Sequence, residues 1–177
     1  MKILLDAMGT INLEKLKNGL PFISKIMGAF MMEAVIYCLT KQGHVSGSAL
    51  KITGDWEKEF IIEWDYLLNA NSLKSWNDWK EATEYAAMGI TVLAMMELTK
   101  FCTFERAAQD AGVDFWVTDT DKKENARLEV SGIWKETKSN SINMRINLKR
   151  KQLKPSKDSS YISVVEFGTP KAKIIKR

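Results

Sequence analysis

Hydrophobic and polar positions divide the chain into two differently patterned parts. In the first part, residues 21–42 are mostly apolar and precede Gly43, and glycine commonly ends helices, so we predict a helix there with Pro21 near its start. Two β-prone runs, residues 45–53 and 57–65, flank Gly54-Asp55-Trp56, and this arrangement predicts a β-hairpin. The first part therefore contributes one helix and one hairpin.

The second part begins after a polar connection over residues 69–75. Residues 77–100 predict a long helix, because the first turn is acidic, as the helix dipole favours, and the later turns are apolar on nearly every side. Shorter segments follow it in the order strand, strand, strand, helix, strand. They are residues 101–107, 113–119, 126–133, 141–154 (ended by Pro155) and 161–167, with a basic end that can add one more strand.

Length and composition favour a single folded domain. The chain has 177 residues, of which 45% are hydrophobic and 27% charged, the balance of a folded protein. We predict one α/β domain over residues 1–177 with a mixed central sheet. Residues 77–177 form its core, and residues 1–76 form an N-terminal helix and hairpin that cover one face of the sheet.

Apolar segments and cysteines bear on the compartment. The two most apolar stretches, residues 26–39 and 85–96, are shorter than the roughly 20 residues that cross a bilayer, and Asp6 interrupts the apolar N-terminus. Cys38 and Cys102 lie far apart in apolar surroundings, which is typical of free thiols in a reducing compartment. We therefore predict a cytoplasmic protein without a membrane partner.

Charge is distributed unevenly along the chain. Residues 135–177 contain 12 Lys or Arg and three acids, a net +9, whereas the first 134 residues carry a net −5. A basic C-terminal quarter is what a surface that contacts a polyanion requires. A solvated, lysine-rich tail explains the same composition, so charge alone leaves both interpretations open.

Two acids are the main candidates for chemistry. Asp114 lies in the second of the three consecutive predicted strands, and Glu129 lies in the third, 15 positions later. Strand alternation puts Asp114 and Trp116 on the face opposite Val113, Phe115 and Val117. Two carboxylates on neighbouring strands can hold a hard cation such as Mg²⁺, with waters in its remaining positions.

The order α-β-β-β-α-β, with these acids in its second and third strands, resembles the core of the PD-(D/E)XK, or restriction-endonuclease-like, nuclease superfamily. The resemblance implies that Asp114 and the Glu129 of an E-x-K motif bind Mg²⁺ or Mn²⁺ for phosphodiester hydrolysis. It also implies a third acid from the first core helix, where Glu84 is preferred over Glu81 and Glu97. Many nucleases of this fold are dimers, so a homodimer is a candidate assembly.

The chain departs from the motif at one position. Ser131 stands where the E-x-K lysine belongs. Some members of the superfamily supply the cation, or a glutamine, from the second core helix. Arg145, Lys149 and Gln152 form one stripe of that helix here. The resemblance makes Lys149 the candidate for a migrated lysine, with Lys151 second.

A second resemblance is local. Residues 126–133, Ala-Arg-Leu-Glu-Val-Ser-Gly-Ile, and residues 164–167, Val-Val-Glu-Phe, resemble segments of a bacterial protein family of uncharacterised activity. In that family a glycine-rich turn comes before an aromatic segment, and residues 107–112 replace that turn here. This resemblance implies no particular reaction.

Three functions follow as expectations. The first is a Mg²⁺- or Mn²⁺-dependent nuclease that acts on nucleic acid, with catalytic candidates Asp114, Glu129, Ser131, Lys149 and Gln152 and nucleic-acid contacts from Arg145, Lys151 and Trp116. The second is a nuclease-fold module that binds nucleic acid or an acidic partner without cleaving it, favoured by the missing lysine. The third is an interaction protein that has no nucleic-acid contact.

Two further glutamates have simpler interpretations. Glu105, in the first of the consecutive strands, can be another ligand or can pair with Arg106 or Arg127. Glu166, in the last predicted strand, can reach the site or face solvent. We expect a pairing role for Glu105 and a solvent-facing role for Glu166.

Overall fold

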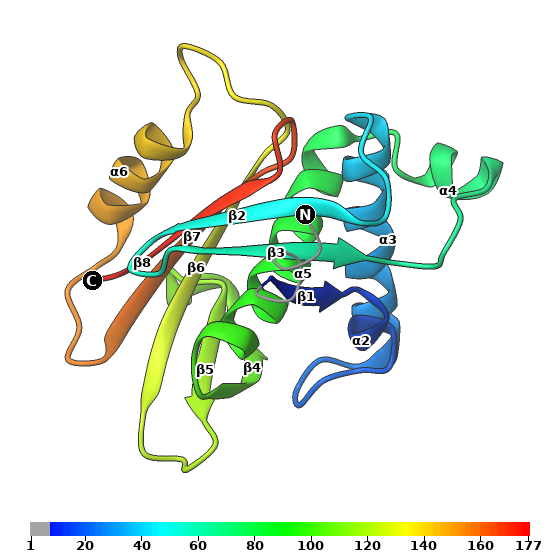
Figure 1. Cartoon of the computed structure of the whole chain (residues 1–177). Helices are drawn as coiled ribbons and strands as arrows, with labels where there is room; N and C mark the ends of the chain where they lie inside the picture. The colour runs from blue at the N-terminus through cyan, green and yellow to red at the C-terminus, as the bar shows by residue number, and fades with distance from the viewer. Residues whose placement is uncertain (1–7) are drawn as a thin grey trace.

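The computed structural model describes residues 8–177, so the prediction that rests on Asp6 lies outside it. One eight-stranded mixed sheet runs through the molecule in the order β1-β3-β2-β8-β7-β6-β5-β4 (Figure 1). The strands are β1 (Gly9–Asn12), β2 (Ser48–Gly54), β3 (Lys58–Glu63), β4 (Phe101–Arg106), β5 (Phe115–Asp119), β6 (Asn125–Ile133), β7 (Ser159–Glu166) and β8 (Lys171–Lys176). The predicted mixed α/β class is confirmed.

Five α-helices occur among the described residues. They are α2 (Glu14–Lys17), α3 (Lys25–Lys41), α4 (Ala70–Ser75), α5 (Trp79–Leu98) and α6 (Ile142–Gln152). Side chains at the helix starts explain where the longer ones begin. Ser24, Asp78 and Ser141 each accept hydrogen bonds from backbone N–H groups of the first turn of α3, α5 and α6. Gly43 follows α3 at a φ of 87°, as its predicted stop requires.

The core elements follow the predicted order. Strands β4, β5 and β6 form an antiparallel series, α6 crosses from β6 to the parallel strand β7, and β8 pairs antiparallel with β7. The basic end therefore forms a strand. Chain order and spatial order agree from β4 to β8.

The N-terminal hairpin takes a place that differs from the prediction. Strand β2 pairs in parallel with β8, so the hairpin extends the core sheet and does not cover its face. Strand β1 then adds in parallel to β3 at the outer edge. Edge pairing explains this placement, because a strand such as β8 offers unpaired backbone groups on its free side. Helix α3 of the N-terminal part packs on α5 and shares the larger hydrophobic cluster with β2 and β3.

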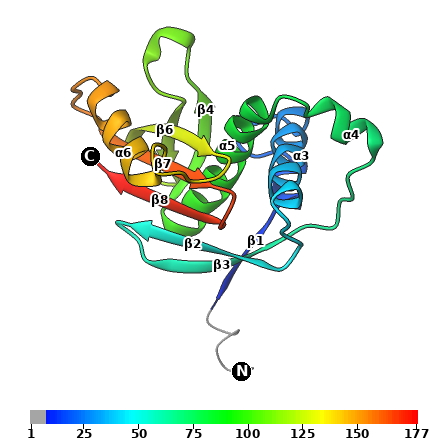
Figure 2. The same cartoon turned by 90° about the horizontal axis from the view of Figure 1, so that it is seen from above.

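Two hydrophobic clusters occupy the two faces of the core sheet. Ala126, Leu128 and Val130 of β6 belong to the larger cluster, with α3 and α5. Ile133 of β6 belongs to the smaller cluster, with α6 and β7. Figures 1 and 2 show α6 at one side of the strands and α3 with α5 at the other. Helices α5 and α6 therefore cover opposite faces of β6, and the side chains of β6 alternate between them.

Within residues 8–177, no helix combines the length and the hydrophobicity that a transmembrane segment needs. The two apolar stretches noted in the sequence are parts of α3 and α5 and pack against each other. The side chain of Cys38 is buried in α3, whereas that of Cys102 in β4 is half-buried, and both are free thiols.

Candidate functional site

Asp114 and Glu129 lie next to each other on adjacent strands. Asp114 immediately precedes β5, and its backbone N–H donates to Leu128 O at 3.1 Å. Its side-chain Oδ2 accepts a hydrogen bond from Val130 N at 2.8 Å. These two bonds fall on either side of Glu129, so the register sets Asp114 opposite Glu129 on one sheet face.

Glu129 points to the face that α6 covers. Its neighbours Leu128 and Val130 point the other way, toward α5. Only 9% of Glu129 is exposed, which is unusual for a glutamate in the middle of a strand. A buried carboxylate needs partners, and α6 supplies one.

Lys149 of α6 makes that contact. Its Nζ lies 2.5 Å from Glu129 Oε1, and the two side chains are 21% and 12% exposed. Lys149 shares the inward stripe of α6 with Ile146 and Leu153, which pack on the sheet. The helix thus carries a lysine within a hydrophobic contact surface, directly over a strand glutamate.

Burial raises the pKa of the Glu129 carboxyl. The hydrogen bond from Lys149 opposes this effect, while the negative charge of Asp114 raises the pKa further. The net result is a pKa above the usual value for glutamate. Because Asp114 acts on the titration of Glu129, the two acids share one electrostatic environment.

Arg106, at the end of β4, is the partner of Asp114 that sequence reasoning missed. Its Nη1 donates to Asp114 Oδ1 and to Asp114 O, both at 3.0 Å. Its side chain is 54% exposed, so this ion pair lies at the surface and its arginine can move into solvent. The only signal in the sequence was the succession of two predicted strands. If these strands pair antiparallel, as β4 and β5 do, the end of the first lies beside the start of the second.

The acids predicted from the first core helix lie elsewhere. Glu81 and Glu84 are exposed residues of α5, and Glu97 forms an ion pair with Lys15 of α2 at 2.9 Å. Helix α5 packs on the sheet face opposite to Glu129, as the close approach of Gly132 to Thr83 shows. The structure therefore does not bring Glu84 to the two strand acids. Helix order alone did not reveal which face α5 would cover.

The remaining predicted site residues on β5, β6 and α6 take different positions relative to Asp114 and Glu129. Ser131 lies two positions after Glu129 on β6, and Trp116 of β5 lies opposite Arg127 of β6, so both are on the face of Glu129. Gln152 is exposed at the last position of α6. Val113 packs against the α6 cluster, on the face predicted for Asp114, because the regular alternation begins only at Phe115.

Arg145 and Lys151 lie on α6, away from its buried stripe. Arg145 is half-buried and donates from Nη2 to Asn140 Oδ1 at 2.9 Å, and Lys151 is exposed. Arg145 precedes Lys149 by about one turn of helix. Both cations are therefore available to a ligand that lies along α6.

The expectation for Glu166 was wrong. Glu166 is 1% exposed, and its carboxylate accepts hydrogen bonds from the backbone N–H groups of Gly168, Thr169 and Glu136. It closes the turn between β7 and β8 and takes no part in the site. Glu105 is exposed on β4, and neither expected partner contacts it: Arg106 pairs with Asp114, and Arg127 donates to Ser160 Oγ and Lys154 O.

The donor set fits a hard cation only in part. Among the described residues, no group of three or more His, Cys, Asp or Glu side chains gathers where it could hold a metal ion. Two carboxylates suffice for Mg²⁺, which keeps several waters when bound to proteins. Lys149 and Arg106 already neutralise these carboxylates, so a cation must displace at least one of them.

Comparisons of this chain with protein-family models, with curated proteins and with solved structures find no match.

Proposed function

We propose that the chain is a Mg²⁺-dependent nuclease-like protein that hydrolyses phosphodiester bonds in nucleic acid, built on a restriction-endonuclease-like core. The observation that carries this proposal is the grouping of Asp114, Glu129 and Lys149. Two acids come from adjacent strands, and a lysine from the following helix lies 2.5 Å from one of them. This grouping restores an acid–acid–lysine set although Ser131 occupies the usual position of the lysine.

In this proposal Asp114 and Glu129 would hold the cation, and their carboxylates now contact Arg106 and Lys149. The bound Mg²⁺ would supply charge stabilisation at the phosphate and an acidified water. The Lys149 ammonium, which lies beside Glu129, would donate to a phosphate oxygen or orient a water. Arg145 and Lys151 extend the positive surface along α6.

The test is a cleavage assay. End-labelled single- and double-stranded DNA and RNA are incubated with the protein in Mg²⁺ or Mn²⁺. We expect Asp114→Asn, Glu129→Gln and Lys149→Met each to reduce the cleavage rate by about 100-fold or more, the scale on which single catalytic groups act. Asp158→Asn and Glu84→Gln change exposed acids outside the site and are the matched controls. Equal cleavage by all five variants would contradict the proposal.

A second candidate is a binding module that does not cleave. Both carboxylate oxygens of Asp114 and one of Glu129 already have partners, and this favours a site that is complete without a cation. Such a protein would retard labelled nucleic acid in a gel and leave its length unchanged in either metal. The binding would weaken steeply with added salt, since contacts to phosphates release counterions.

A further inference from the structure

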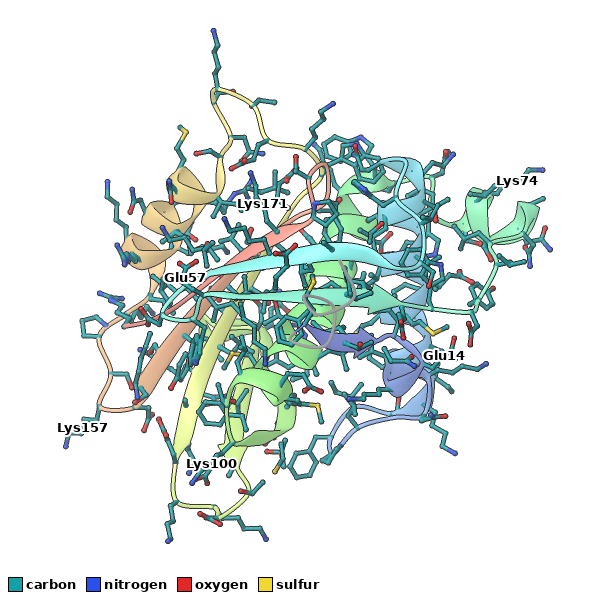
Figure 3. The ribbon with its side chains drawn as sticks, viewed as in Figure 1. Glu14, Glu57, Lys74, Lys100, Lys157 and Lys171 are labelled. Carbon is teal, nitrogen blue, oxygen red and sulfur yellow. The ribbon has the colours of Figure 1, made fainter. Side chains whose placement is uncertain are left out.

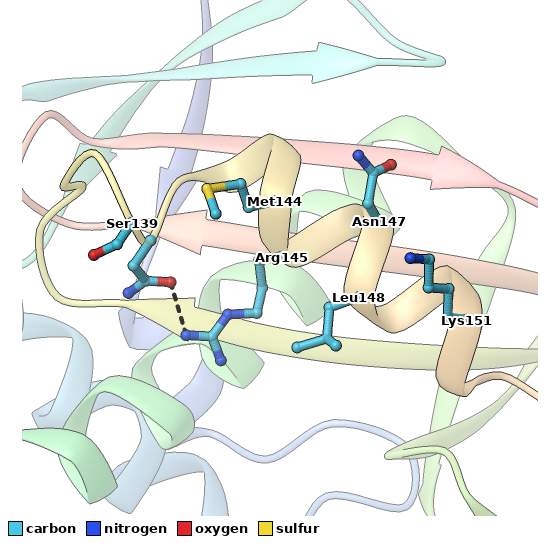
Figure 4. A pocket seen from close by; sticks show the side chains of 7 residues that line it. Ser139, Met144, Arg145, Asn147, Leu148 and Lys151 are labelled. Carbon is cyan, nitrogen blue, oxygen red and sulfur yellow. Dashed lines mark hydrogen bonds between the residues drawn. The ribbon is translucent and has the colours of Figure 1, made fainter.

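A hollow lies on the solvent side of α6, the helix whose sheet-facing side carries Lys149. Its volume is about 670 Å³, and it is formed by the outer surface of α6 and the connection that precedes this helix (Figure 4). Arg145 lines it one helical turn before Lys149, and Leu148 lines it directly before Lys149. The hollow and the Lys149–Glu129 contact therefore lie on different sides of the same helix.

The lining combines an apolar shelf with polar groups. Met144 and Leu148 are 50% and 48% exposed and stand one turn apart on α6. Asn140 Oδ1 accepts a hydrogen bond from Arg145 at 2.9 Å, which holds the guanidinium at the edge of the hollow. Lys151 lies at the other end, as Figure 4 shows. The lining suits a ligand that is apolar in one part and anionic in another.

The segment that forms the hollow and follows it is positively charged. Residues 145–157 contain six Lys or Arg and no acid. Lys149 forms an ion pair with Glu129, whereas the side chains of Arg150, Lys151, Lys154 and Lys157 are exposed. Lys157, in the connection after α6, extends away from the body of the molecule (Figure 3). This surface complements a polyanion.

We infer that the hollow holds one nucleotide unit of a single-stranded nucleic acid. Its base lies on Met144 and Leu148, and the adjoining phosphates contact Arg145 and Lys151. In a duplex the bases are stacked inside and the phosphates lie outside, so a duplex would leave this apolar shelf without a partner. An unpaired strand offers both a base face and phosphates. The inference rests on the proposed function and specifies its substrate as single-stranded.

The test measures binding without cleavage. Fluorescence anisotropy is recorded with a labelled 12-nucleotide single strand and with a duplex of the same length, in buffer without divalent metal. We expect Met144→Ser/Leu148→Ser to weaken single-strand binding about tenfold and to leave duplex binding unchanged. Arg145→Gln should weaken binding and reduce the salt slope by about one. Leu67→Ser, at an 85% exposed leucine outside the hollow, is the control and should change nothing.

The outcomes separate this inference from the nuclease proposal. If the wild type cleaves nucleic acid but Met144→Ser/Leu148→Ser binds the single strand as tightly as the wild type does, the single-strand site is wrong and the nuclease proposal stands. If the double variant loses single-strand affinity but no protein cleaves either probe, the site stands and catalysis is wrong. Equal losses for single strand and duplex, or binding that salt does not weaken, would overturn the inference.

Discussion

Lys149 Nζ lies 2.5 Å from Glu129 Oε1 and joins α6 to the middle of the sheet through a largely buried ion pair. Burying two charges is costly, and neutral side chains of similar size often serve stability as well or better. The same helix face already has Ile146 and Leu153 as hydrophobic contacts. An ion pair at this place is therefore better explained by chemistry than by packing.

The pair predicts a particular pH dependence of stability. The pKa of Glu129 is raised in the folded protein, so its ionised form destabilises the fold as pH rises through that pKa. We expect Glu129→Gln/Lys149→Met to be about 1 kcal/mol more stable than the wild type at pH 8, with the difference shrinking on acidification. Urea unfolding at several pH values measures this difference in unfolding free energy, with Glu105→Gln as control. A double variant clearly less stable than wild type at pH 8 would show that the pair is structural.

Arg106 predicts a change in metal affinity. Its guanidinium competes with a cation for Asp114 Oδ1. Arg106→Gln should raise the affinity for Mn²⁺ severalfold and change the free energy of unfolding by less than about 1 kcal/mol, because the pair is solvent-exposed. Calorimetric titration of the variant beside Arg150→Gln, which removes an exposed arginine from α6, checks this. Weaker binding by Arg106→Gln would mean that the arginine orients Asp114 for its role.

Glu33 of α3 fixes the position of α4 through hydrogen bonds. Its carboxylate accepts hydrogen bonds from Tyr66 Oη at 2.7 Å and from Ser72 Oγ and Trp76 Nε1, both at 2.9 Å. Burial raises the pKa of Glu33, but these three bonds lower it more, so the net pKa lies below the usual value. The stability that Glu33 contributes is therefore present at neutral pH and lost as pH falls through that lowered pKa.

We expect Glu33→Gln to destabilise the protein by about 2 kcal/mol at pH 7 and by less in acid, since an amide cannot accept all three bonds. Hydrogen exchange should show faster opening of the α4 amides than of those in α6. Uniform destabilisation of both helices would indicate that Glu33 supports the whole fold and not only α4.

At Gly132 the backbones of β6 and α5 approach so closely that a larger side chain does not fit. A Cβ at this position would collide with the backbone oxygen of Thr83. Gly132→Ala should therefore cost about 2–3 kcal/mol of unfolding free energy. Ser131→Ala changes the neighbouring residue on the other face and should stay within about 0.5 kcal/mol. Thermal melts of the two variants give the comparison, and similar melting temperatures would refute the close contact.

Periodicity predicted the long elements well and the short ones poorly. Helices α3, α5 and α6 lie within the predicted ranges because their apolar residues extend over several turns. Strand β1 and helix α2 have four residues each, too few for a period to be seen. Helix α4 falls in a segment predicted as a polar connection, because Asn69 caps it and Glu33 holds it from a distant part of the chain.

Some features of the candidate site could be predicted from the sequence, and others depend on how the elements pack. Glu129 could be placed on the face opposite Leu128 and Val130 because a strand alternates with a fixed period, whereas Asp114 lies just before β5 and Val113 breaks the alternation assumed there. The position of Lys149 over Glu129 was suggested by helical spacing together with the family resemblance. The pairing of Arg106 with Asp114 depends on strand register, and the remoteness of Glu84 depends on which face α5 covers. Neither of these is encoded in local sequence.

The proposed nuclease activity requires that Asp114 and Glu129 together hold one divalent cation. Crystals soaked in Mn²⁺ and measured at a wavelength where manganese scatters anomalously test this directly. We expect one anomalous peak between the two carboxylates, with the Lys149 ammonium moved away from Glu129. No peak between them, with Lys149 still bonded to Glu129 and Arg106 to Asp114, would contradict it.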